Sequence, residues 1–154
     1  MVIKHNIFKS EDYGLNYTYN QIKEFHKAFN HPVSEIPISI PNERKEHRAE
    51  WMREEINEFL DAKNIHEEAD AMIDLIYFAL GTLVEMGIDK PQNIMDIVQN
   101  ANMSKLFPDG KPHYREDGKV IKPEGWEAPD PKIKEFIENM ISNRIRQGEI
   151  SDFQ

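Results

Sequence analysis

Apolar residues recur at steps of three and four in five separate stretches of the chain. Such steps place side chains on one face of an α-helix, so the pattern predicts five helices. They are expected over residues 18–30, 42–63 and 65–87, and in the stretches that begin at Pro91 and Pro131. We expect Asn42 to cap the second helix. Each helix should bury its apolar face, which in the second carries Ala49, Met52, Ile56, Phe59 and Leu60, and in the third Ile65, Ala69, Met72, Ile73, Ile76, Leu80, Leu83 and Val84.

Other stretches are predicted to lie outside helices. Residues 32–41 contain three prolines alternating with Val and Ile, which forbids a helix and favours an extended surface connector. Residues 106–126 form a short polar insert in which Asp109-Gly110 and Asp117-Gly118 are turn signals, so it can form at most a small hairpin. The first 16 residues lack clear periodicity and are expected to be loosely docked. The chain is thus predicted to be a single all-α domain over residues 1–154.

Length and composition agree with one globular core. The chain has 154 residues, 39% of them hydrophobic, and no Cys. The lack of Cys excludes disulfides, thiolate metal sites and a cysteine nucleophile, and it favours the cytoplasm as the compartment. No apolar run approaches the roughly 18 residues that a membrane helix needs, and the start has no apolar signal-peptide core. We therefore expect no membrane association.

The charge balance is acidic, with 28 Asp and Glu against 19 Lys and Arg, a formal net charge of -9. Such a chain is a poor binder of nucleic-acid phosphate, so duplex DNA is not an expected partner. The negative charge has two readings. It is either a solvated surface or a set of carboxylates that hold cations, which then attract an anionic ligand.

Two acidic stripes lie at helical spacing. Glu54, Glu55 and Glu58 fall within one turn of the second predicted helix, and the third carries its stripe at Glu67, Asp70 and Asp74. Carboxylates crowded on one face repel one another, and a divalent cation would offset that repulsion. Oxygen ligands without His or Cys select Mg²⁺, or Mn²⁺, over zinc. The alternative, which spacing alone does not exclude, is an acidic helix face that is exposed to solvent and binds no metal.

Four sequence blocks resemble a known superfamily. They read E-E-x-x-E at Glu54 to Glu58, A-D-A-M-I-D-L-I-Y-F-A-L-G-T at Ala69 to Thr82, G-I-D at Gly87 to Asp89, and A-N-M-S-K-L-F-P-D-G-K-P-H-Y-R-E-D-G-K-V-I-K-P-E-G-W at Ala101 to Trp126. Together they resemble the all-α nucleoside triphosphate pyrophosphohydrolases, which include MazG, the dimeric dUTPases and phosphoribosyl-ATP pyrophosphohydrolase. The last block is similar to the phosphoribosyl-ATP pyrophosphohydrolase-like subgroup. The resemblance spans about Gln21 to Asp130 and implies a MazG-like helical bundle.

The resemblance also implies a reaction. Enzymes of this superfamily hydrolyse a nucleoside triphosphate between the α and β phosphates, with Mg²⁺ as cofactor, and release a monophosphate and pyrophosphate. Their E-x-x-E and E-x-x-D pairs bind the metal, which implies Glu55 and Glu58 as ligands here. Glu54 is then a candidate to orient or deprotonate the attacking water, with a solvated helix residue as its alternative.

The second acidic pair is less clear in this chain. Glu67 and Asp70 form the intact E-x-x-D, whereas matching Asp74 through its distance to Gly87 puts Ala71 where an acid is expected. Glu67, Asp70 and Asp74 therefore all stay candidate metal ligands.

Basic residues gather after the fourth predicted helix and are candidates to bind phosphate. Asn102 stands three residues before the first of them and is a candidate for the sugar and phosphate. Arg115 offers the fork geometry that suits phosphate oxygens. We expect the insert 106–126 to act as a lid that faces the acidic stripes, and a loop of solvated lysines is the alternative. The basic residues are Lys105, Lys111, Arg115, Lys119 and Lys122.

Aromatic residues offer a further candidate site. Tyr114 and Trp126, or Phe25 and Trp51 together with His26, could contact a base, but packing in the core or anchoring of the lid is the favoured interpretation for them. Base and sugar preference are not fixed by these motifs.

The sequence lacks the motifs of three other site types. A di-iron bundle needs Glu-x-x-His, which does not occur in the sequence, and the EF-hand and P-loop patterns are missing too. The remaining alternatives are phosphoribosyl-ATP as substrate and a non-enzymatic acidic interaction module. We expect a homodimer or homotetramer, because the chain resembles family members that complete the nucleotide pocket across a subunit interface.

Overall fold

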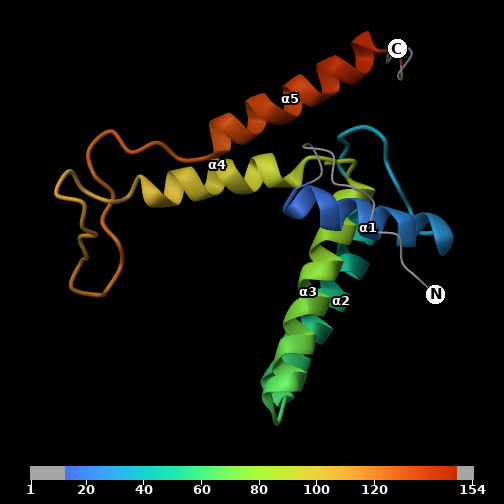
Figure 1. Cartoon of the computed structure of the whole chain (residues 1–154), viewed down its shortest axis with the longest axis horizontal. Coiled ribbons are helices and arrows are strands. Elements are labelled where there is room, and N and C mark those ends of the chain that lie inside the picture. Colours follow the sequence, from blue (N-terminus) through green and yellow to red (C-terminus); the bar gives the residue numbers. More distant parts are fainter. Residues whose placement is uncertain (1–12, 149–154) are drawn as a thin grey trace. The chain divides into compact units, whose positions relative to one another are not determined.

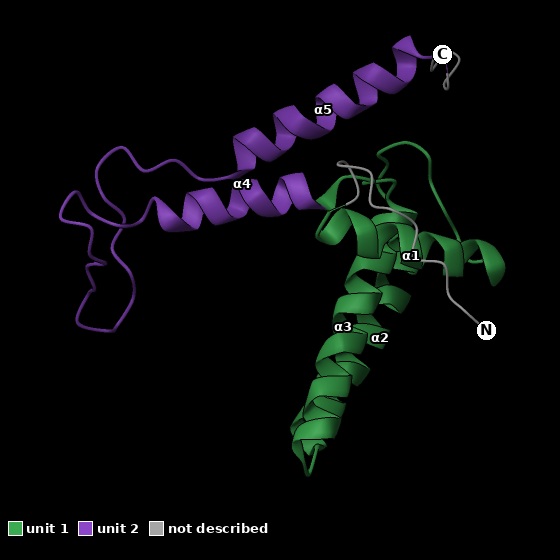
Figure 2. Ribbon diagram, viewed as in Figure 1, with its two compact units in different colours: residues 1–91 green, residues 92–154 purple. Residues whose placement is uncertain are grey.

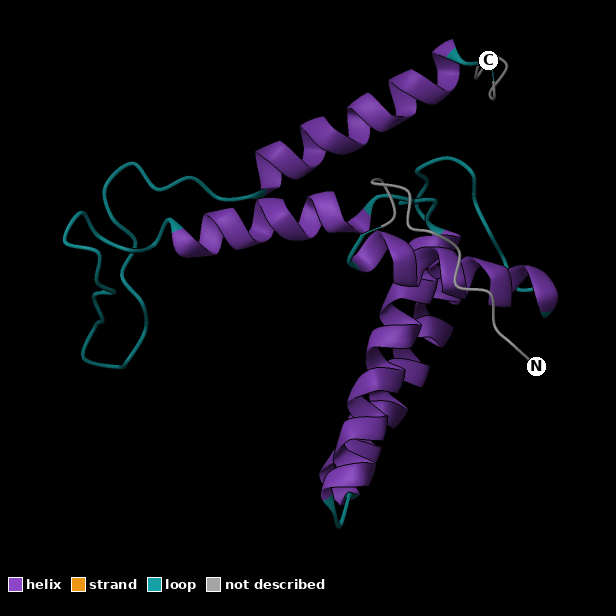
Figure 3. Ribbon diagram, in the orientation of Figure 1, coloured by secondary structure: helices purple, strands orange, loops and turns teal. Residues whose placement is uncertain are grey.

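The computed structural model describes residues 13–148 and contains five α-helices (Figures 1 and 3). No strand occurs in this range, which confirms the all-α class. Most of the predicted loosely docked start, residues 1–12, lies outside the described residues. The helices are α1 (Leu15–Ala28), α2 (Asn42–Asp61), α3 (Ile65–Glu85), α4 (Pro91–Met103) and α5 (Asp130–Arg146).

The chain divides into two compact units, Met1–Pro91 and Gln92–Gln154 (Figure 2). The first holds α1 to α3, and the second holds α5 and all of α4 except its first residue. The single-domain organisation stays a prediction.

In the first unit, α2 and α3 run antiparallel along each other, and α1 packs on α3 (Figure 1). The core lies where α1 meets the C-terminal half of α3. Tyr19 and Ile22 from α1 contact Leu80 and Val84 from α3, and all four side chains are buried. This small core holds α1 on the C-terminal half of α3, and α3 in turn packs along α2.

Helix α1 begins at Leu15, three residues before the predicted start. Its buried face consists of Asn16, Tyr19, Ile22 and His26 at steps of three and four. Because Asn16, the buried residue of the first turn, is polar, the apolar pattern did not include this turn. The burial pattern, rather than hydrophobicity, defines the helix face here.

Both ends of α3 agree with the prediction. Asn64 accepts hydrogen bonds from the amides of His66 and Glu67 at 3.0 and 3.1 Å and so caps the N-terminus. After the helix, Gly87 has a φ of 69°, and a Cβ atom there would collide with the carbonyl group of Ile36. Only glycine fits this close approach of the connector to the helix end.

The connector over residues 31–41 is free of helix, as predicted. It is held to the end of α3 by backbone bonds from Ser34 to the carbonyl of Val84 and from Ile38 to that of Met86, 3.2 and 2.9 Å long. The predicted cap of α2 is wrong, however. Asn42 is already the first helical residue, and the cap position belongs to Pro41, which forms no side-chain cap bond.

The predicted burial along α2 and α3 is also wrong in part. Arg48 and Glu55 are the buried residues of α2. Among the described residues of the first unit, the far halves of the two helices pack on each other, because α1 covers α3 near its other end. Two helices alone cannot cover a wide apolar face, so seven residues predicted to be buried are exposed: Ile56, Phe59, Leu60, Ile65, Ala69, Ile73 and Ile76.

In the second unit, the apolar residues predicted to face inward from α4 and α5 are half-buried. The insert between the helices forms a minimal hairpin. Its single antiparallel bridge joins Tyr114 and Val120 across the turn at Asp117-Gly118. The predicted hairpin is confirmed in its smallest form.

Candidate active site

A buried carboxylate lies at the centre of the acidic residues of α2 and α3. Glu55 is only 9% exposed, and its Oε2 atom has no hydrogen-bond partner. Burial raises the pKa of Glu55, and four neighbouring carboxylates raise it further, in the order Glu58, Asp74, Glu54 and Asp70. The packing of α2 on α3 thus brings Asp70 and Asp74 of the second stripe near Glu55 of the first.

This arrangement is unfavourable without a cation. Glu55 is buried, whereas Glu54, Glu58, Asp70 and Asp74 are exposed around it. A carboxylate removed from water and surrounded by like charges is stabilised by a bound cation. The donors are all hard oxygen atoms, which fit Mg²⁺ or Mn²⁺.

The side chains are not drawn into a finished coordination shell. Within residues 13–148, no three His, Asp or Glu side chains are grouped closely enough to hold a metal ion. Four of the five carboxylates stand on exposed helix surface, where side chains can change rotamer. A cation would therefore have to gather the ligands around the fixed Glu55.

Glu67 has a different local role. Its carboxylate accepts hydrogen bonds from the amide of Lys63 at 2.8 Å and from the side-chain amide of Asn64 at 2.7 Å. Together with the bonds that Asn64 accepts, this is a variant of the capping box at the start of α3. Both carboxylate oxygens of Glu67 thus take part in capping, and its role as a metal ligand stays a prediction.

An aromatic pocket lies in the same unit, among α1, α2, α3 and the connector. Its volume is about 250 Å³. The rings of Trp51 and Phe78 lie 5.9 Å apart, and Phe25 meets Tyr77 edge to face at 5.8 Å. The pocket is lined by Phe25, His26, His31, Arg48, Trp51, Tyr77 and Phe78.

A buried ion network supports this pocket. Glu85 accepts hydrogen bonds from Arg44 at 2.8 and 2.7 Å, and its Oε1 lies 3.4 Å from Nη1 of Arg48. The Arg48 side chain is 3% exposed and that of Glu85 is fully buried. Burial lowers the pKa of Arg48, while the hydrogen bonds with Glu85 raise that of Arg44. The network joins the start of α2 to the end of α3.

Gly81 makes room for the buried groups beneath the pocket. A methyl group at this position would lie 2.5 Å from Nη2 of Arg48 and 3.0 Å from Nε2 of His26. Arg48 cannot move aside, because it donates to the hydroxyl of Thr82 at 3.0 Å and to the carbonyl of Phe78. Glycine at this helix position is therefore required by packing.

In the second unit, two of the predicted phosphate-binding lysines gather on Trp126. The ammonium groups of Lys122 and Lys105 lie 4.2 and 5.5 Å from the centre of its ring. Lys105 also donates to the side chain of Asn102 at 2.8 Å, so these two candidates do meet. The indole of Trp126 donates to the carbonyl of Ala101 at 2.8 Å, which agrees with its interpretation as an anchor of the insert.

Two further candidates lie at the turn of the hairpin. Arg115 pairs with Asp117 at 2.6 Å, and the backbone amide of Lys119 donates to the same carboxylate at 3.1 Å. The backbone of Arg115 also donates to the carbonyl of Lys119 at 2.9 Å. The structure thus places Lys105, Lys122 and Asn102 in a Trp126 group and Arg115 and Lys119 in a turn group. Lys111, whose backbone amide donates to Asp109 at 2.9 Å, belongs to neither group.

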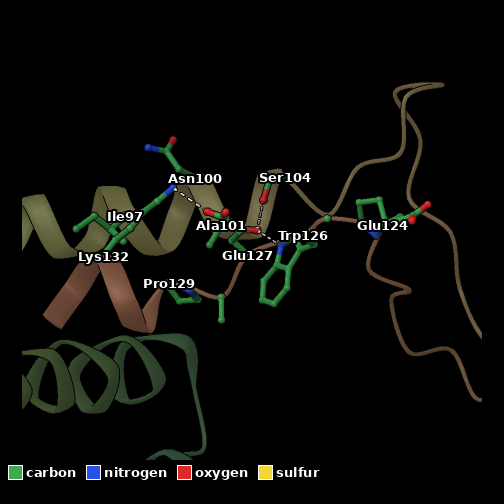
Figure 4. Close-up of a pocket in the computed structure, with 12 residues that line it drawn as sticks. Ile97, Asn100, Ala101, Ser104, Glu124, Trp126, Glu127, Pro129 and Lys132 are labelled. Atoms are coloured by element: carbon green, nitrogen blue, oxygen red, sulfur yellow. Dashed lines mark hydrogen bonds and ion pairs between the residues drawn. The ribbon is translucent and has the colours of Figure 1, made fainter. Parts of the chain in front are cut away.

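A larger pocket of about 420 Å³ lies beside Trp126, between the end of α4 and the start of α5 (Figure 4). Ser104 and Trp126 both donate to the carbonyl of Ala101 at its edge. Lys132 lies 3.8 Å from Glu127, and Glu124 also lines the pocket. Because its charged residues are of mixed sign, the pocket has no clear preference for an anion.

The sequence did not point to five residues of the first unit that line or support the pocket: His31, Arg48, Tyr77, Phe78 and Glu85. A signal did exist for Phe78. Trp51 stands four residues before Glu55, and Phe78 four residues after Asp74, so the pocket and the carboxylates share helix faces. The pairing of Arg48 with Glu85 joins positions 37 residues apart in sequence and needs the tertiary structure.

The predicted placement of the basic insert opposite the acidic stripes concerns both units and stays a prediction.

None of the helices in the described part of the chain is long and apolar enough to span a membrane.

The chain was compared with known families and proteins. Residues 22–102, more than half of the chain, match the family model described as phosphoribosyl-ATP pyrophosphohydrolase. The match contains α2, α3 and the whole carboxylate cluster, and it ends before the basic insert. No curated protein matches the chain significantly. The chain therefore belongs to the phosphoribosyl-ATP pyrophosphohydrolase family, and this membership supports a pyrophosphohydrolase activity on a nucleotide-like substrate.

Proposed function

We propose that the protein hydrolyses a nucleoside triphosphate between the α and β phosphates and releases the monophosphate and pyrophosphate. The observation that carries this proposal is the buried Glu55, which has an oxygen without a hydrogen-bond partner and is surrounded by four further carboxylates. A protein tolerates such a centre when a cation and its anionic ligand complete it. The family match supplies the reaction class.

Glu55, Glu58, Asp70 and Asp74 are the proposed ligands of Mg²⁺, or of Mn²⁺. When bound, the cation neutralises phosphate oxygens and lowers the pKa of bound water. Glu54 is exposed and directly precedes Glu55 on the same turn of α2, so it is the proposed acceptor of the proton that water loses as its oxygen attacks the α phosphorus. The bond that breaks joins the bridging oxygen to the α phosphorus, and this oxygen leaves with pyrophosphate.

The phosphate contacts are proposed to come from the second unit. Lys105 and Lys122 are held near each other by Trp126, and Asn102 is bonded to Lys105. Such a group can neutralise phosphate oxygens. Arg115 and Lys119 stand at the hairpin turn, where Arg115 would have to leave Asp117 to bind phosphate. The Trp126 group is therefore better prepared for this role than the turn group.

Phosphoribosyl-ATP is the second candidate substrate, because the matching family model carries its name. It contains the same α–β phosphoanhydride bond, so the same carboxylates would serve. Its base carries an extra phosphorylated sugar, which needs a cation at the base end. In the aromatic pocket the Arg48 guanidinium is already bonded to Thr82 and Phe78. This pairing favours an unmodified base.

The decisive experiment is a release assay for pyrophosphate. The full chain would be given the eight common NTPs and dNTPs, and separately phosphoribosyl-ATP, each with Mg²⁺ and with EDTA. We expect metal-dependent release of pyrophosphate from at least one nucleoside triphosphate. Activity on phosphoribosyl-ATP alone would select the second candidate. No release from any substrate, together with no binding of Mg²⁺, would leave the acidic helices as an interaction module.

We also propose a homo-oligomer in which a second copy covers the exposed apolar face of α2 and α3. Leu60 and Ile65 are each 72% exposed and Ile73 is 62% exposed, which is unusual for so many large side chains on one helical hairpin. Light scattering should give at least twice 18.1 kDa for the wild-type chain. A monomer that retains activity would contradict this proposal.

A further inference from the structure

Helix α1 passes into the connector through a tight turn next to His26. The amide of His31 donates to the carbonyl of His26 at 2.7 Å, and Asn30 adopts a φ of 55°. This bond across a left-handed residue is a Schellman motif. The turn leads the chain back along the helix, so that the carbonyl of Pro32 lies 2.8 Å from Nδ1 of His26. The imidazole of His26 therefore joins the end of α1 to the first residues of the connector.

The bond to Pro32 fixes which nitrogen of His26 carries a proton. A carbonyl oxygen can only accept, so Nδ1 is the donor. His26 is 2% exposed, and burial lowers the pKa of its imidazole below the ordinary value of 6.5. The imidazole is therefore neutral at neutral pH, and its Nε2, which has no proton, lies against Gly81 of α3.

A buried cation lies next to this nitrogen. A methyl group on Gly81 would be 3.0 Å from Nε2 of His26 and 2.5 Å from Nη2 of Arg48, so the two nitrogen atoms are at most about 5.5 Å apart. Arg48 is held in place by its bonds to Thr82 and Phe78. A proton on Nε2 would therefore place two positive charges side by side where water is excluded, which is unfavourable.

Two further titratable groups face His26. Glu85 of α3 favours its protonation, but this carboxylate already accepts two hydrogen bonds from Arg44 and lies 3.4 Å from Arg48. His31 of the connector, whose ring centre is 5.4 Å away, opposes protonation. Arg48 opposes it more strongly than Glu85 favours it. The surrounding charges thus act in the same direction as burial.

The contact of His26 with Pro32 controls how the connector leaves α1. Beyond this point, the amides of Ser34 and Ile38 donate to carbonyls at the end of α3. His26 and His31 also line the aromatic pocket. Movement of this corner would therefore break the bonds to α3 and change the pocket together.

We propose that His26 is an acid-sensitive latch: its neutral imidazole joins α1 to the connector, and a proton on Nε2, next to Arg48, releases this corner and opens the aromatic pocket. In the released form the imidazole meets water and binds a proton at its ordinary pKa of 6.5, whereas the closed form binds it only at a lower pH. The closed form therefore loses stability as the pH falls through 6.5. The inference is independent of the proposed function, since no proposed metal ligand takes part.

Hydrogen exchange by NMR on the full chain tests the latch at single amides. From about pH 7.5 to about pH 5.5, the protection factors of Ser34 and Ile38 should fall by about threefold to tenfold, while that of Leu80 in the core is unchanged. His26→Asn keeps a donor near the position of Nδ1 but cannot be protonated, so its protection factors should not change with pH. His47→Asn, at an exposed position on α2, is the matched control and should respond as wild type.

Two outcomes of this exchange experiment would overturn the latch. One is an equal loss of protection at Ser34 and Leu80, which would mean global unfolding. The other is a loss that persists in His26→Asn. The titration of Glu55 cancels in the comparison, because all of these proteins contain this residue.

The His26 imidazole can also be observed directly in wild type, so the test does not depend on the folding of a variant. NMR of the ring nitrogens should show the Nδ1–H form at about pH 7.5 and a titration midpoint below 6.5. A midpoint at or above 6.5 would contradict the latch.

Opening of the pocket can be followed through Trp51. The chain has two Trp, so Trp51 is the single reporter in a Trp126→Phe background. Its fluorescence should shift to the red from about pH 7.5 to about pH 5.5, and it should not shift when His26→Asn is added. Unchanged emission in the background alone would show that the pocket stays closed, and this part of the inference would be wrong.

Discussion

The guanidinium carbon of Arg48 lies 5.3 Å from the centre of the Trp51 ring. The two residues are nearly one turn apart on α2, so the buried ion network and the aromatic pocket meet at this contact. A cation over an aromatic face is favourable when both are removed from water. Changes in the network should therefore alter the stability of the fold and the shape of the pocket together.

Replacement of Glu85 by Gln should destabilise the protein strongly. The variant keeps the shape of the side chain but leaves the buried Arg48 without its counter-charge. Breaking such a pair typically costs about 3–5 kcal/mol, which urea unfolding would measure. Glu138→Gln is the control, because Glu138 is paired with Lys134 on the exposed surface of α5, where the loss should stay below about 1 kcal/mol. Equal losses in the two variants would contradict the role given to the network.

Glu55→Gln should stabilise the metal-free protein at neutral pH. Burial and neighbouring carboxylates raise the pKa of Glu55 above its ordinary value of 4.5. Below that value the group is protonated in both the folded and unfolded states and contributes nothing. As the pH rises through the raised pKa, the folded state has to hold an unfavourable charge, and the destabilisation is complete above it. The melting temperature of the variant should exceed that of wild type at pH 7, and the difference should vanish below pH 4.5.

The same melting curves test the metal site. Mg²⁺ should raise the melting temperature of wild type more than that of Glu55→Gln, because a ligand that binds only the folded state stabilises it. Glu46→Gln, at an exposed position on the same helix, is the control and should behave as wild type in both respects. An increase with Mg²⁺ that is equal in all three proteins would exclude Glu55 as a ligand.

Glu58→Gln and Asp74→Asn should each abolish Mg²⁺-dependent turnover and leave the helices intact. An amide keeps the shape of a carboxylate but loses the charge that holds a hard cation. Glu67→Gln tests whether Glu67 is a metal ligand or only caps the start of α3. Because Glu67 bonds the start of α3, its replacement should lower stability by about 0.5–2 kcal/mol and retain turnover. Loss of turnover in a folded Glu67→Gln protein would place Glu67 among the ligands.

Gly87→Ala should be far more harmful than Gly118→Ala. Both glycines have a positive φ, 69° and 79°, so both substitutions carry a strain of about 1 kcal/mol. At Gly87 the new methyl group also meets the carbonyl of Ile36, whereas at Gly118 the space is open. We expect the loss at Gly87 to exceed the loss at Gly118 by more than about 1 kcal/mol. Chemical denaturation of the two variants would check this order.

Lys105→Ala should weaken nucleotide binding and leave metal binding unchanged, with a smaller effect for Arg115→Ala, since Arg115 is paired with Asp117. Isothermal titration with a non-hydrolysable nucleotide and with Mg²⁺ would separate the two affinities. Hydrogen exchange should also show protection gained over residues 106–126 when both are bound, as expected of a lid. Unchanged hydrogen exchange, together with unchanged nucleotide affinity in both variants, would show that the insert is a solvated loop and not a lid.

The sequence by itself determined the elements and the chemistry that they carry. Regular apolar steps over residues 65–87 predicted α3 to within two residues, because this signal acts over a few neighbouring residues. The two acidic stripes and their candidate ligands could be found in the same way, since residues three and four apart share a helix face. Local spacing thus predicted which residues stand together on a helix.

The tertiary structure decided what each face meets. The side chains of Leu60 and Ile73 are exposed while Arg48 and Glu55 are buried, which reverses the order that hydrophobicity predicts. Periodicity identifies a face but carries no information about which helix covers it, and α1 covers only one end of the helical pair. The pairing of Arg48 with Glu85 and the pocket above it depend on contacts between distant segments, so only the packed helices could place them.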